Sequence, residues 1–562
     1  MDQGLRNTQR APRSCIDCSR RKVRCNKRIP CDVCIRRGLA STCSRERVRV
    51  KGRFMLDGAA DEPASYEDLL QENAQLRILL DESRSAPPAT FDEGEEMFTL
   101  DENLDMFDRM LFERLSSTAH SPTVACESDV EFPSRETSEY LLAQGYRTSS
   151  WCHFAVHHQT LAREHDQFWE SCPDPVSRTT YDPSWLALYF SFISSVAVFN
   201  DDVAGYENDI SGSRTSQPDR VQKWYDCALF YLHKANFLHV PDLRTVQSIA
   251  ILTNCFNIVG DFNLYLILIP VAIRIAKILK IDCESQLRRR PLIEQEICRR
   301  TWWTLIICEW LPVPYRNPCI HEADFDVNLP AIANDDEIGP DGVSRTLPLS
   351  HPRPVHYHIA MIRAAQVKYR FRTALKARPL SRTDVVRLVT GADEDLARII
   401  DDLPPYLHAD SDELLLPVPS SQSAQSWPPP TAGEARDAAF SWVPRQRILI
   451  SLVLLNHRMA INNTLQSSWS DESILLQRIR SICMDSSSAM ITLALRDGIE
   501  LEFLNTWGPL SHLFSAAVTL ILEAELNPVR KLCQTLRKMQ VHNKVAYEAL
   551  RIIEELLEKG AN

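Results

Sequence analysis

The chain has 562 residues, of which 44% are hydrophobic and 24% are charged, a composition that excludes collagen, a coiled-coil rod and wholesale disorder. The length is enough for several compact units of about 150 residues each. The net charge of −11 is unevenly distributed, because residues 1–53 carry 16 Lys and Arg against four acids, whereas the remaining residues carry 47 basic and 70 acidic side chains. A basic amino-terminal segment on an acidic remainder predicts a nucleic-acid-binding module joined to a protein-facing body.

Residues 1–13 are polar, and the longest apolar stretch, residues 262–273, has 12 residues. A membrane span needs about 20. We therefore expect no secretory signal, no membrane span and no membrane partner. The 17 cysteines then belong to a reducing compartment, where closely spaced cysteines are metal ligands more often than disulfides.

Six cysteines fall within 29 residues in the pattern C-x2-C-x6-C-x5-C-x2-C-x8-C, and they are Cys15, Cys18, Cys25, Cys31, Cys34 and Cys43. The gap of two residues lets both thiolates of a C-x2-C pair reach one metal ion, at about 2.3 Å. Six thiolates are two short of the eight that two separate tetrahedral sites need, so two ligands would be shared. Sulfur ligation favours zinc, and we expect two zinc ions per chain. The alternatives are a disulfide-stapled domain, which lacks its signal peptide, and an iron–sulfur or redox cluster, which normally uses four cysteines.

The six cysteines, Pro30 before the fourth of them and the basic run at residues 20–24 resemble the fungal Zn2Cys6 binuclear zinc cluster transcription factors. The resemblance implies that Cys15 and Cys31 bridge the two ions. It also implies that Arg21 and Lys22 enter the DNA major groove, with Lys22 as the main base reader. A lysine suits the N7 and O6 acceptors of guanine, as in CGG-type triplets. The basic run is in addition typical of a nuclear localisation signal.

The residues that we expect to contact DNA are Arg20, Arg21, Lys22, Arg24, Lys27, Arg28, Arg45, Arg47 and Arg49. The last three belong to a second basic stretch, residues 45–53, which follows the last cysteine. This stretch is expected to contact phosphates rather than bases. Residues 1–53 thus form the predicted DNA-binding domain.

Residues 54–85 are predicted to be a linker followed by a short coiled-coil helix. Its expected dimerisation seam consists of Tyr66, Leu69, Asn73, Leu76 and Leu80. A buried Asn at position a favours a parallel dimer in one register, and the resemblance also implies a homodimer. The seam spans fewer than three heptads, so a simple amphipathic helix docked on the body remains an alternative.

Residues 86–135 are predicted to be an acidic, partly disordered linker. Within it, residues 90–113 alternate acids with large apolar side chains, a pattern typical of transcriptional activation segments. An amphipathic helix that caps the body explains the same pattern, and the sequence favours neither.

The remaining chain is predicted to be all-α, with a helical domain at residues 136–402, a Pro/Ser-rich loop at 403–434 and a carboxy-terminal helical part at 435–562. The strongest helix predictions are residues 185–199, 221–237, 245–281 with breaks near Gly260 and Pro270, 292–310, 356–375, 383–402, 445–462, 473–495 and 529–558.

Three segments of this body, residues 272–279, 294–303 and 324–330, look like the fungal-specific transcription factor domain, or middle homology region. We expect Trp302 and Trp303 to be core residues, and Arg299 and Arg300 to pair with acids or cap helix ends.

The chain lacks the dinucleotide, P-loop, zinc-protease and serine-hydrolase motifs, so we expect no enzyme. The best alternative metal site is His153, His157, His158 and His165, of which the first two would share a helix face.

Together these features predict a nuclear, zinc-dependent regulator of RNA polymerase II transcription that binds CGG-type triplets as a homodimer and activates a metabolic or specialised-metabolite gene cluster. Its expected partners are double-stranded DNA, a second copy of the chain, coactivators or corepressors, and a small-molecule inducer. The alternatives are a repressor with the same DNA module and a metabolite-binding helical body tethered to DNA.

Overall fold

The structure is a computed structural model of the whole chain, and it describes residues 6–8, 14–23, 25–26, 31–39, 43, 48–50, 106–116, 122–149, 151–199, 217–311, 318–344, 351–377, 379–409, 442–470, 473–496, 504, 506–540 and 543–560. Contacts divide the chain into two compact units, residues 1–93 and 94–562. The finer division into six segments stays a prediction. The predicted dimerisation seam at residues 66–80 lies outside the described residues, as does most of the Pro/Ser-rich loop.

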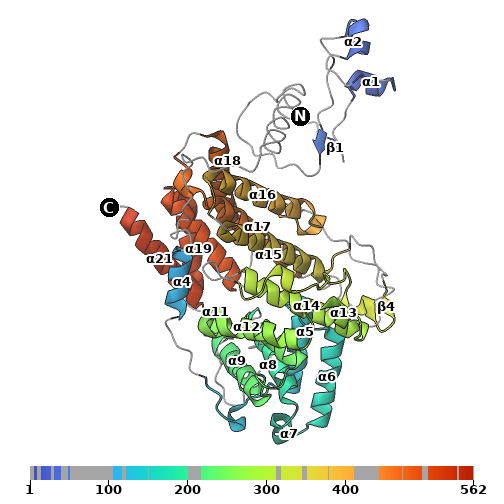
Figure 1. Cartoon of the computed structure of the whole chain (residues 1–562), viewed down its shortest axis with the longest axis vertical. Coiled ribbons are helices and arrows are strands. Elements are labelled where there is room, and N and C mark those ends of the chain that lie inside the picture. Colours follow the sequence, from blue (N-terminus) through green and yellow to red (C-terminus); the bar gives the residue numbers. More distant parts are fainter. Residues whose placement is uncertain are drawn as a thin grey trace. The chain divides into compact units, whose positions relative to one another are not determined.

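The described part of the first unit consists of two short helices and two short strands (Figure 1). The helices are α1 (Ile16–Arg20) and α2 (Asp32–Arg36). Strand β1 (Arg6–Thr8) pairs in parallel with β2 (Val48–Val50). This pairing joins the segments that precede and follow the cysteine-rich residues.

The first part of the second unit is a sequence of helices that, apart from α4, are built around one hydrophobic core. Its elements are α4 (Met106–Ser116), η3 (Glu127–Asp129), α5 (Arg135–Thr148), α6 (His158–Ser171), α7 (Pro175–Thr179), α8 (Pro183–Val198), α9 (Gln217–Lys234), α10 (Leu243–Leu252), α11 (Phe256–Val259), α12 (Phe262–Ile278), α13 (Glu284–Leu287) and α14 (Leu292–Trp310). Helix α8 is buried on nearly all sides because α5, α9 and α10 pack around it. The core also holds Trp302, which is fully buried, and Trp303, as predicted.

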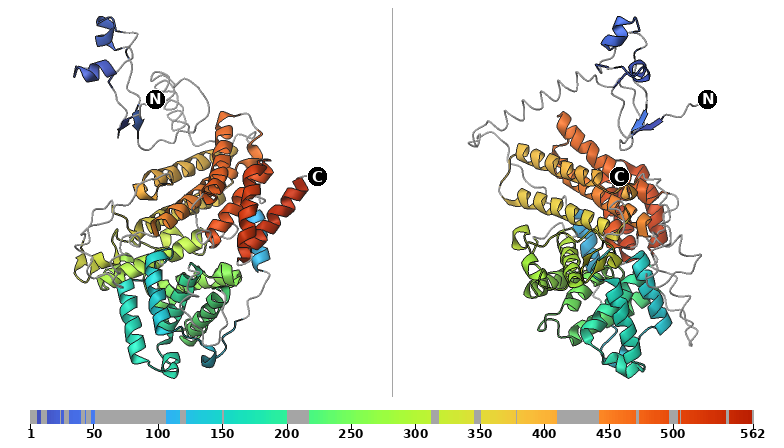
Figure 2. Two further views of the ribbon diagram at one scale, coloured as in Figure 1. Left: turned by 180° about the vertical axis from the view of Figure 1, so that it is seen from behind. Right: turned by 90° about the vertical axis from the view of Figure 1, so that its right-hand side faces the viewer.

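The second part continues after a short irregular connection. Its elements are η5 (Glu322–Asp324), η6 (Asp335–Glu337), β3 (Ile338–Gly339), β4 (Gly342–Val343), α15 (Pro354–Ala377), α16 (Arg382–Asp401), η7 (Pro405–Leu407), α17 (Trp442–Asn463), η8 (Gln466–Ser468), α18 (Ile474–Ala494), α19 (Trp507–Leu522), α20 (Leu526–Met539) and α21 (Lys544–Gly560). Helices α15, α16, α17 and α18 lie side by side in both views of Figure 2. Strands β3 and β4 form a two-residue antiparallel pair.

The all-α prediction is confirmed, because the described part of the second unit is built almost entirely of helices. The segment at 292–310 is predicted with both ends correct. The predicted break near Gly260 is also observed, between α11 and α12. None of the described helices combines the length and the apolar character needed to cross a membrane.

Two helix predictions were wrong. Pro270 does not break the chain but lies inside α12; proline there costs about 3 kcal/mol of helix stability, and the buried Ile269, Ala272 and Ile273 around it pack into the core and offset that cost. The predicted helix at 529–558 is two helices, α20 and α21. Helices α5, α6 and α19 were not among the strongest predictions, although nine of the 16 residues of α19 are buried.

Helix α4 decides part of the question that the sequence left open for residues 90–113. Leu111 and Leu115 are buried in the core formed by α17–α21. The ring of Phe112 lies 5.5 Å from that of Phe262 and 6.3 Å from that of Trp507, both edge-on. At residues 106–116 the chain is therefore a helix that packs on the body, and residues 90–105 lie outside the described residues.

Candidate metal centre and nucleic-acid interface

Each C-x2-C pair of the cluster begins a five-residue helix. Cys15 is the N-cap of α1, and its Sγ accepts a hydrogen bond from the Cys18 N–H at 3.4 Å. Cys31 is the N-cap of α2 and accepts from the Cys34 N–H at the same distance. Side-chain acceptors at an N-cap satisfy N–H groups that have no partner inside the helix. In each half of the cluster, the first turn of a short helix therefore holds both cysteines of the C-x2-C pair close together.

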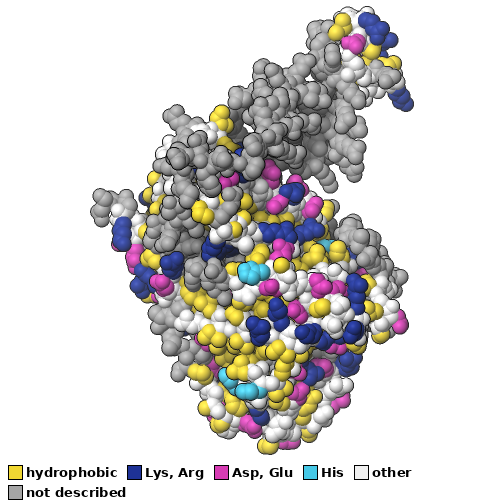
Figure 3. Space-filling view, in the orientation of Figure 1, with side chains coloured by type: hydrophobic (Ala, Val, Ile, Leu, Met, Phe, Trp, Pro, Cys, Tyr) yellow, Lys and Arg dark blue, Asp and Glu magenta, His cyan; other side chains and the backbone are white. Residues whose placement is uncertain are grey.

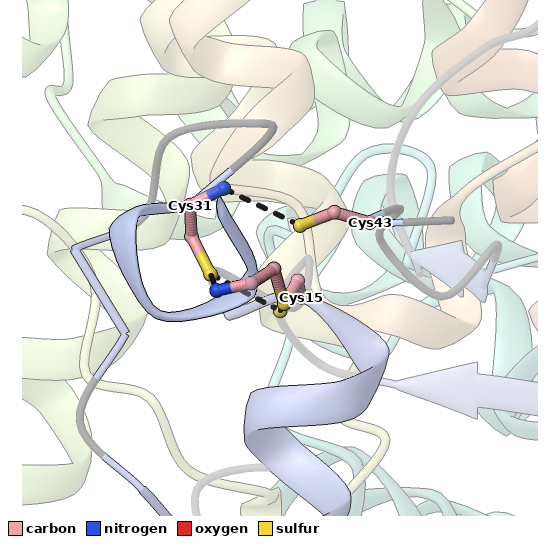
Figure 4. A group of neighbouring side chains, drawn as sticks. Cys15, Cys31 and Cys43 are labelled. Atoms are coloured by element: carbon pink, nitrogen blue, oxygen red, sulfur yellow. Dashed lines mark hydrogen bonds between the residues drawn. The ribbon is translucent and has the colours of Figure 1, made fainter. Parts of the chain in front are cut away.

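The six sulfur atoms converge on one small volume. Cys15 Sγ lies 3.7 Å from Cys31 Sγ, and Cys18 Sγ lies 3.5 Å from Cys31 Sγ. The third short distance, 3.7 Å, joins Cys15 Sγ and Cys34 Sγ. In Figure 4, Cys15, Cys31 and Cys43 point toward one another, and the Cys31 N–H donates to Cys43 Sγ at 3.4 Å. All six cysteines are at most 9% exposed.

The ligand atoms fall into two overlapping groups of four. One consists of Cys15, Cys18, Cys25 and Cys31, and the other of Cys15, Cys31, Cys34 and Cys43, with all ligand atoms of a group within 4.8 Å of one another. Only Cys15 and Cys31 belong to both groups. Two four-thiolate sites that share two sulfurs are the arrangement that six cysteines allow for two tetrahedral ions.

The chemistry of the buried thiols fits a metal centre. Burial and the thiols of Cys15 and Cys31 raise the pKa of Cys18 to about 12, since its thiolate would have no counter-charge. Burial opposes ionisation of Cys31 as well, but hydrogen bonds, first from the Cys34 N–H, lower its pKa to about 6. A divalent cation is the partner that would hold such a set of sulfurs deprotonated.

Basic side chains lie at the end of α1, directly after the cysteine pair. Arg20, Arg21 and Lys22 are all exposed, and Figure 3 shows Lys and Arg side chains gathered on the described part of this unit. Two hydrogen bonds end the helix: the Lys22 N–H donates to Ser19 O at 3.2 Å, and the Val23 N–H donates to Cys18 O at 3.1 Å. This pattern is the Schellman motif.

The other half of the cluster presents a second basic pair that was not predicted. Arg36 and Arg37 are exposed at the end of α2. They lie 16 residues after Arg20 and Arg21, the same offset that relates Cys15 to Cys31, so the internal repeat was the signal that could have found them. The other predicted DNA contacts, Arg24, Lys27, Arg28, Arg45 and Arg47, lie outside the described residues. Of Arg49, the structure describes only the backbone, in β2.

The alternative histidine site is not supported. His153 lies in a turn and His157 is the N-cap of α6, so the two do not share a helix face. His153 Nδ1 lies 2.7 Å from Ala250 O, and His165 Nε2 lies 2.8 Å from Ser138 Oγ, so each has its own partner. Within the described residues, the cysteine groups are the candidate metal sites that the geometry identifies.

Comparison with known families agrees with the geometry. Residues 13–52 match the fungal Zn(2)-Cys(6) binuclear cluster domain, and residues 205–324 match Cep3, a component of the centromere DNA-binding protein complex CBF3. Residues 13–52 are thus a binuclear cluster domain, a domain that binds two zinc ions. Residues 13–52 thus confirm the resemblance to the Zn(2)-Cys(6) zinc cluster proteins, and the Cep3-like region is compatible with a middle homology domain.

Two curated relatives are transcription factors. The chain is 23% identical over 315 residues to the aurofusarin cluster transcription factor aurR2 of Gibberella zeae, which covers 53% of the chain and 44% of the relative. It is 37% identical over 75 residues to the Zn(2)-C6 fungal-type transcription factor pigI of Monascus ruber, which covers 13% and 9%. The chain thus spans less than half the length of either relative. Both relatives are named as transcription factors, which agrees with the prediction that the chain is not an enzyme.

Proposed function

We propose that the protein is a nuclear, sequence-specific DNA-binding transcription factor that activates a metabolic or specialised-metabolite gene cluster. The observation that carries the proposal is the pair of overlapping four-cysteine groups beside exposed basic residues at the end of α1. The relatives support the regulatory class, since both are named as transcription factors.

The six cysteines are proposed as the zinc ligands, with Cys15 and Cys31 shared between the ions. When bound, the two zinc ions supply the cross-links that a segment of this size needs in order to fold. The chain's own contribution is orientation: the N-cap hydrogen bonds to Cys15 and Cys31 fix the start of α1 and α2. The Schellman motif then fixes the direction in which the chain leaves α1, at Lys22.

Lys22 is proposed to read a guanine of a CGG-type triplet, with Arg20, Arg21 and the other predicted basic residues on the sugar–phosphate backbone. Phosphate contacts give affinity that falls with salt, whereas the base contact gives sequence preference. Two triplets would be read by a homodimer, joined through the seam at Tyr66, Leu69, Asn73, Leu76 and Leu80. Coactivators or corepressors and a small-molecule inducer are the proposed partners of the helical unit.

The first experiment measures the zinc content of the purified full-length chain and selects the DNA sequences that it binds. The wild type and Lys22→Ala are compared in both measurements. We expect about two zinc ions in both proteins, because Lys22 is not a ligand, and enriched CGG-type triplets with the wild type alone. Sequence-blind binding by the wild type would refute the proposed readout.

Two matched variants sharpen this experiment. Arg37→Ala removes a basic residue at the corresponding helix end in the other half, and we expect it to weaken binding to all sequences without changing the preferred triplet. Cys31→Ser removes a shared sulfur and is expected to lose zinc from both positions. Cys126→Ser changes an exposed cysteine outside the cluster and should keep both ions.

The alternative to activation is repression through the same DNA module. The packing of Phe112 and Leu115 on the body favours keeping this alternative, because those side chains are engaged and not presented to a coactivator. A reporter gene that carries the selected site, with the full-length chain present or absent, separates the two: activation raises its transcript and repression lowers it.

A further inference from the structure

The helical unit contains a large pocket that the DNA-binding function does not use. It has a volume of about 980 Å³ and is lined by residues of α4, α12, α14, α15, α17 and α19, together with the segment after α10. Pockets that hold small organic ligands have volumes of about 300–1,000 Å³. Helices α15, α17 and α19, which supply much of the lining, are labelled in Figure 1.

The charged residues in the described part of the lining have one sign. Its charged residues are Arg109, Lys368, Arg372 and Lys376, and none of the described lining residues is Asp or Glu. Residues 54–562 as a whole carry 70 acids and 47 basic residues, so the composition of the body alone would lead us to expect the reverse. Such a lining favours an anionic occupant over a cationic one.

One end of the pocket holds a buried histidine without a protein partner. His457 is 2% exposed, and within the described part of the chain neither of its ring nitrogens has a hydrogen-bond partner. The neighbouring Asn456 Oδ1 is buried and also lacks one. Buried polar atoms are nearly always paired, since each unpaired one costs about 1–3 kcal/mol. Asn456 and His457 both line the pocket, so a molecule bound there can satisfy these atoms.

Lys368 and His512 lie at the same end. The His512 ring centroid is 6.2 Å from that of His457, and the Lys368 Nζ donates a hydrogen bond to Leu311 O. Burial and the nearby Lys368 charge lower the pKa of His512 to about 3, and the same causes keep the pKa of His457 well below its usual value. Both imidazoles are therefore neutral near pH 7 and each can donate one hydrogen bond, beside the ammonium group of Lys368.

The rest of the lining is largely apolar. It includes buried side chains of α12, α17 and α19, among them Phe262, Leu452, Val453, Met459 and Val518. An apolar body with a few convergent polar groups is the usual construction of a small-molecule site. We propose that this pocket binds a largely apolar organic anion, with its acidic group against Lys368, His457 and His512. A role of this site in regulating transcription rests on the proposed function. The binding of an organic anion to the pocket does not rest on it.

The test uses two probes with the same ring skeleton and the full-length chain, stripped on a hydrophobic resin, without DNA. The anion is 1-anilinonaphthalene-8-sulfonate, and the neutral probe is N-phenyl-1-naphthylamine. We expect one sulfonate probe per chain and a loss of about tenfold in its affinity in Lys368→Met, as for a charge-assisted contact, with a change of less than about twofold for the neutral probe. Arg363→Met is the control, because Arg363 is an exposed residue of the same helix that pairs with Asp402.

A second variant guards against a folding defect in Lys368→Met. His457→Phe keeps a ring of similar shape and removes both unpaired nitrogens, so we expect a higher melting temperature of the probe-free chain together with weaker binding of the sulfonate probe. Three results would each overturn the proposal. They are equal affinity of the wild type for the two probes, an unchanged affinity for the sulfonate probe in both Lys368→Met and His457→Phe, and no binding of either probe. Because DNA is absent from this test, a failure of triplet selection would not affect the conclusion about probe binding. A failure of probe binding would likewise not affect the conclusion about triplet selection.

Discussion

Lys22 and Gly38 occupy the same position in the two halves of the cysteine cluster, and both adopt left-handed backbone conformations, with φ of 55° and 70°. Each follows a five-residue helix by two residues, and each N–H donates to the carbonyl oxygen three residues earlier, at 3.2 Å from Lys22 and 3.0 Å from Gly38. Glycine adopts this conformation readily, whereas other L-residues pay about 1 kcal/mol or more. One half of the cluster thus has glycine where the other keeps a lysine under strain.

This relationship predicts opposite effects of two substitutions on the stability of the cluster domain. Lys22→Gly should stabilise it by about 1 kcal/mol, and Gly38→Ala should destabilise it by about as much. The second effect comes from the backbone, since among the described residues no atom beyond the chain neighbours lies within 4 Å of the Cβ that Gly38→Ala would add. Zinc transfer to a chromophoric chelator measures both, because unfolding releases the ions.

The same experiment tests why a lysine is kept there. If Lys22 reads a base, Lys22→Gly should hold zinc more firmly yet lose triplet preference, a separation of stability from function that is typical of strained functional residues. Faster zinc release from Lys22→Gly than from the wild type would contradict the strain.

Helix α4 is predicted to be part of the folded helical unit. Leu115 is 3% exposed in the core that α17–α21 form, so Leu115→Ala should lower the free energy of unfolding of this unit by about 2–5 kcal/mol. Its neighbour Glu113 is exposed on the same helix, and Glu113→Ala should change that free energy by less than about 0.5 kcal/mol. Urea unfolding followed by circular dichroism provides the comparison; equal midpoints for the two variants would mean that α4 does not contribute to the core.

A buried ion pair makes the stability of the helical unit depend on pH. Arg300 is fully buried; its guanidinium donates to Asp335 Oδ1 at 2.5 Å and to Glu296 Oε1 at 3.2 Å. Burial alone would raise the pKa of Asp335, but the charge of Arg300 outweighs it and lowers that pKa to about 2. A carboxyl with a lower pKa in the folded state stabilises the fold above its unfolded pKa of about 3.9 and loses that contribution as pH falls through its folded pKa.

We therefore expect the wild type to lose about 2 kcal/mol of unfolding free energy through this group between about pH 5 and pH 2. Asp335→Asn should be less stable than the wild type at pH 7, and the gap between the two should narrow as pH falls. The stability of Asp395→Asn, which changes a half-exposed residue paired with Arg398 on α16, should follow the same pH dependence as that of the wild type. A gap that stays constant from pH 7 to pH 2 would exclude the proposed coupling.

Some features of the molecule could be predicted from local sequence. The C-x2-C spacing predicts that both cysteines of a pair can reach one ion, and in the structure Cys15 and Cys31 each cap the helix that carries the second cysteine of the pair. The prediction that Arg299 and Arg300 pair with acids is confirmed as well: Arg299 lies 2.6 Å from Glu284, and Arg300 contacts Glu296 on its own helix and Asp335 outside it.

The features that were missed depend on tertiary structure. The pocket is lined by residues from Arg109 to Leu522, which no local periodicity brings together. His457 lies within a predicted helix without a motif around it, and only the absence of a partner among the described residues distinguishes it. Pro270 was misjudged for the same reason, since the packing that offsets its cost comes from other helices.

Two helical glycines illustrate this limit and give the last prediction. Gly145 in α5 and Gly391 in α16 both lie inside amphipathic helices, and by helix propensity alone alanine should stabilise each by about 1 kcal/mol. A Cβ on Gly145, however, would lie 2.6 Å from Phe192 Cζ and 2.7 Å from Val196 Cγ2, both on the buried helix α8. At Gly391, apart from the chain neighbours and the backbone of the helix itself, no atom of the described residues lies within 4 Å of the added carbon.

We expect Gly391→Ala to raise the free energy of unfolding by about 1 kcal/mol and Gly145→Ala to lower it by about 1–3 kcal/mol, because the fully buried α8 cannot move away from an overpacked contact without opening its other interfaces. Thermal unfolding of the two single variants and of the double variant measures both effects. The two sites share no partner, so the double variant should show the sum of the single effects. Stabilisation by Gly145→Ala would mean that α5 and α8 are not in close contact at this point.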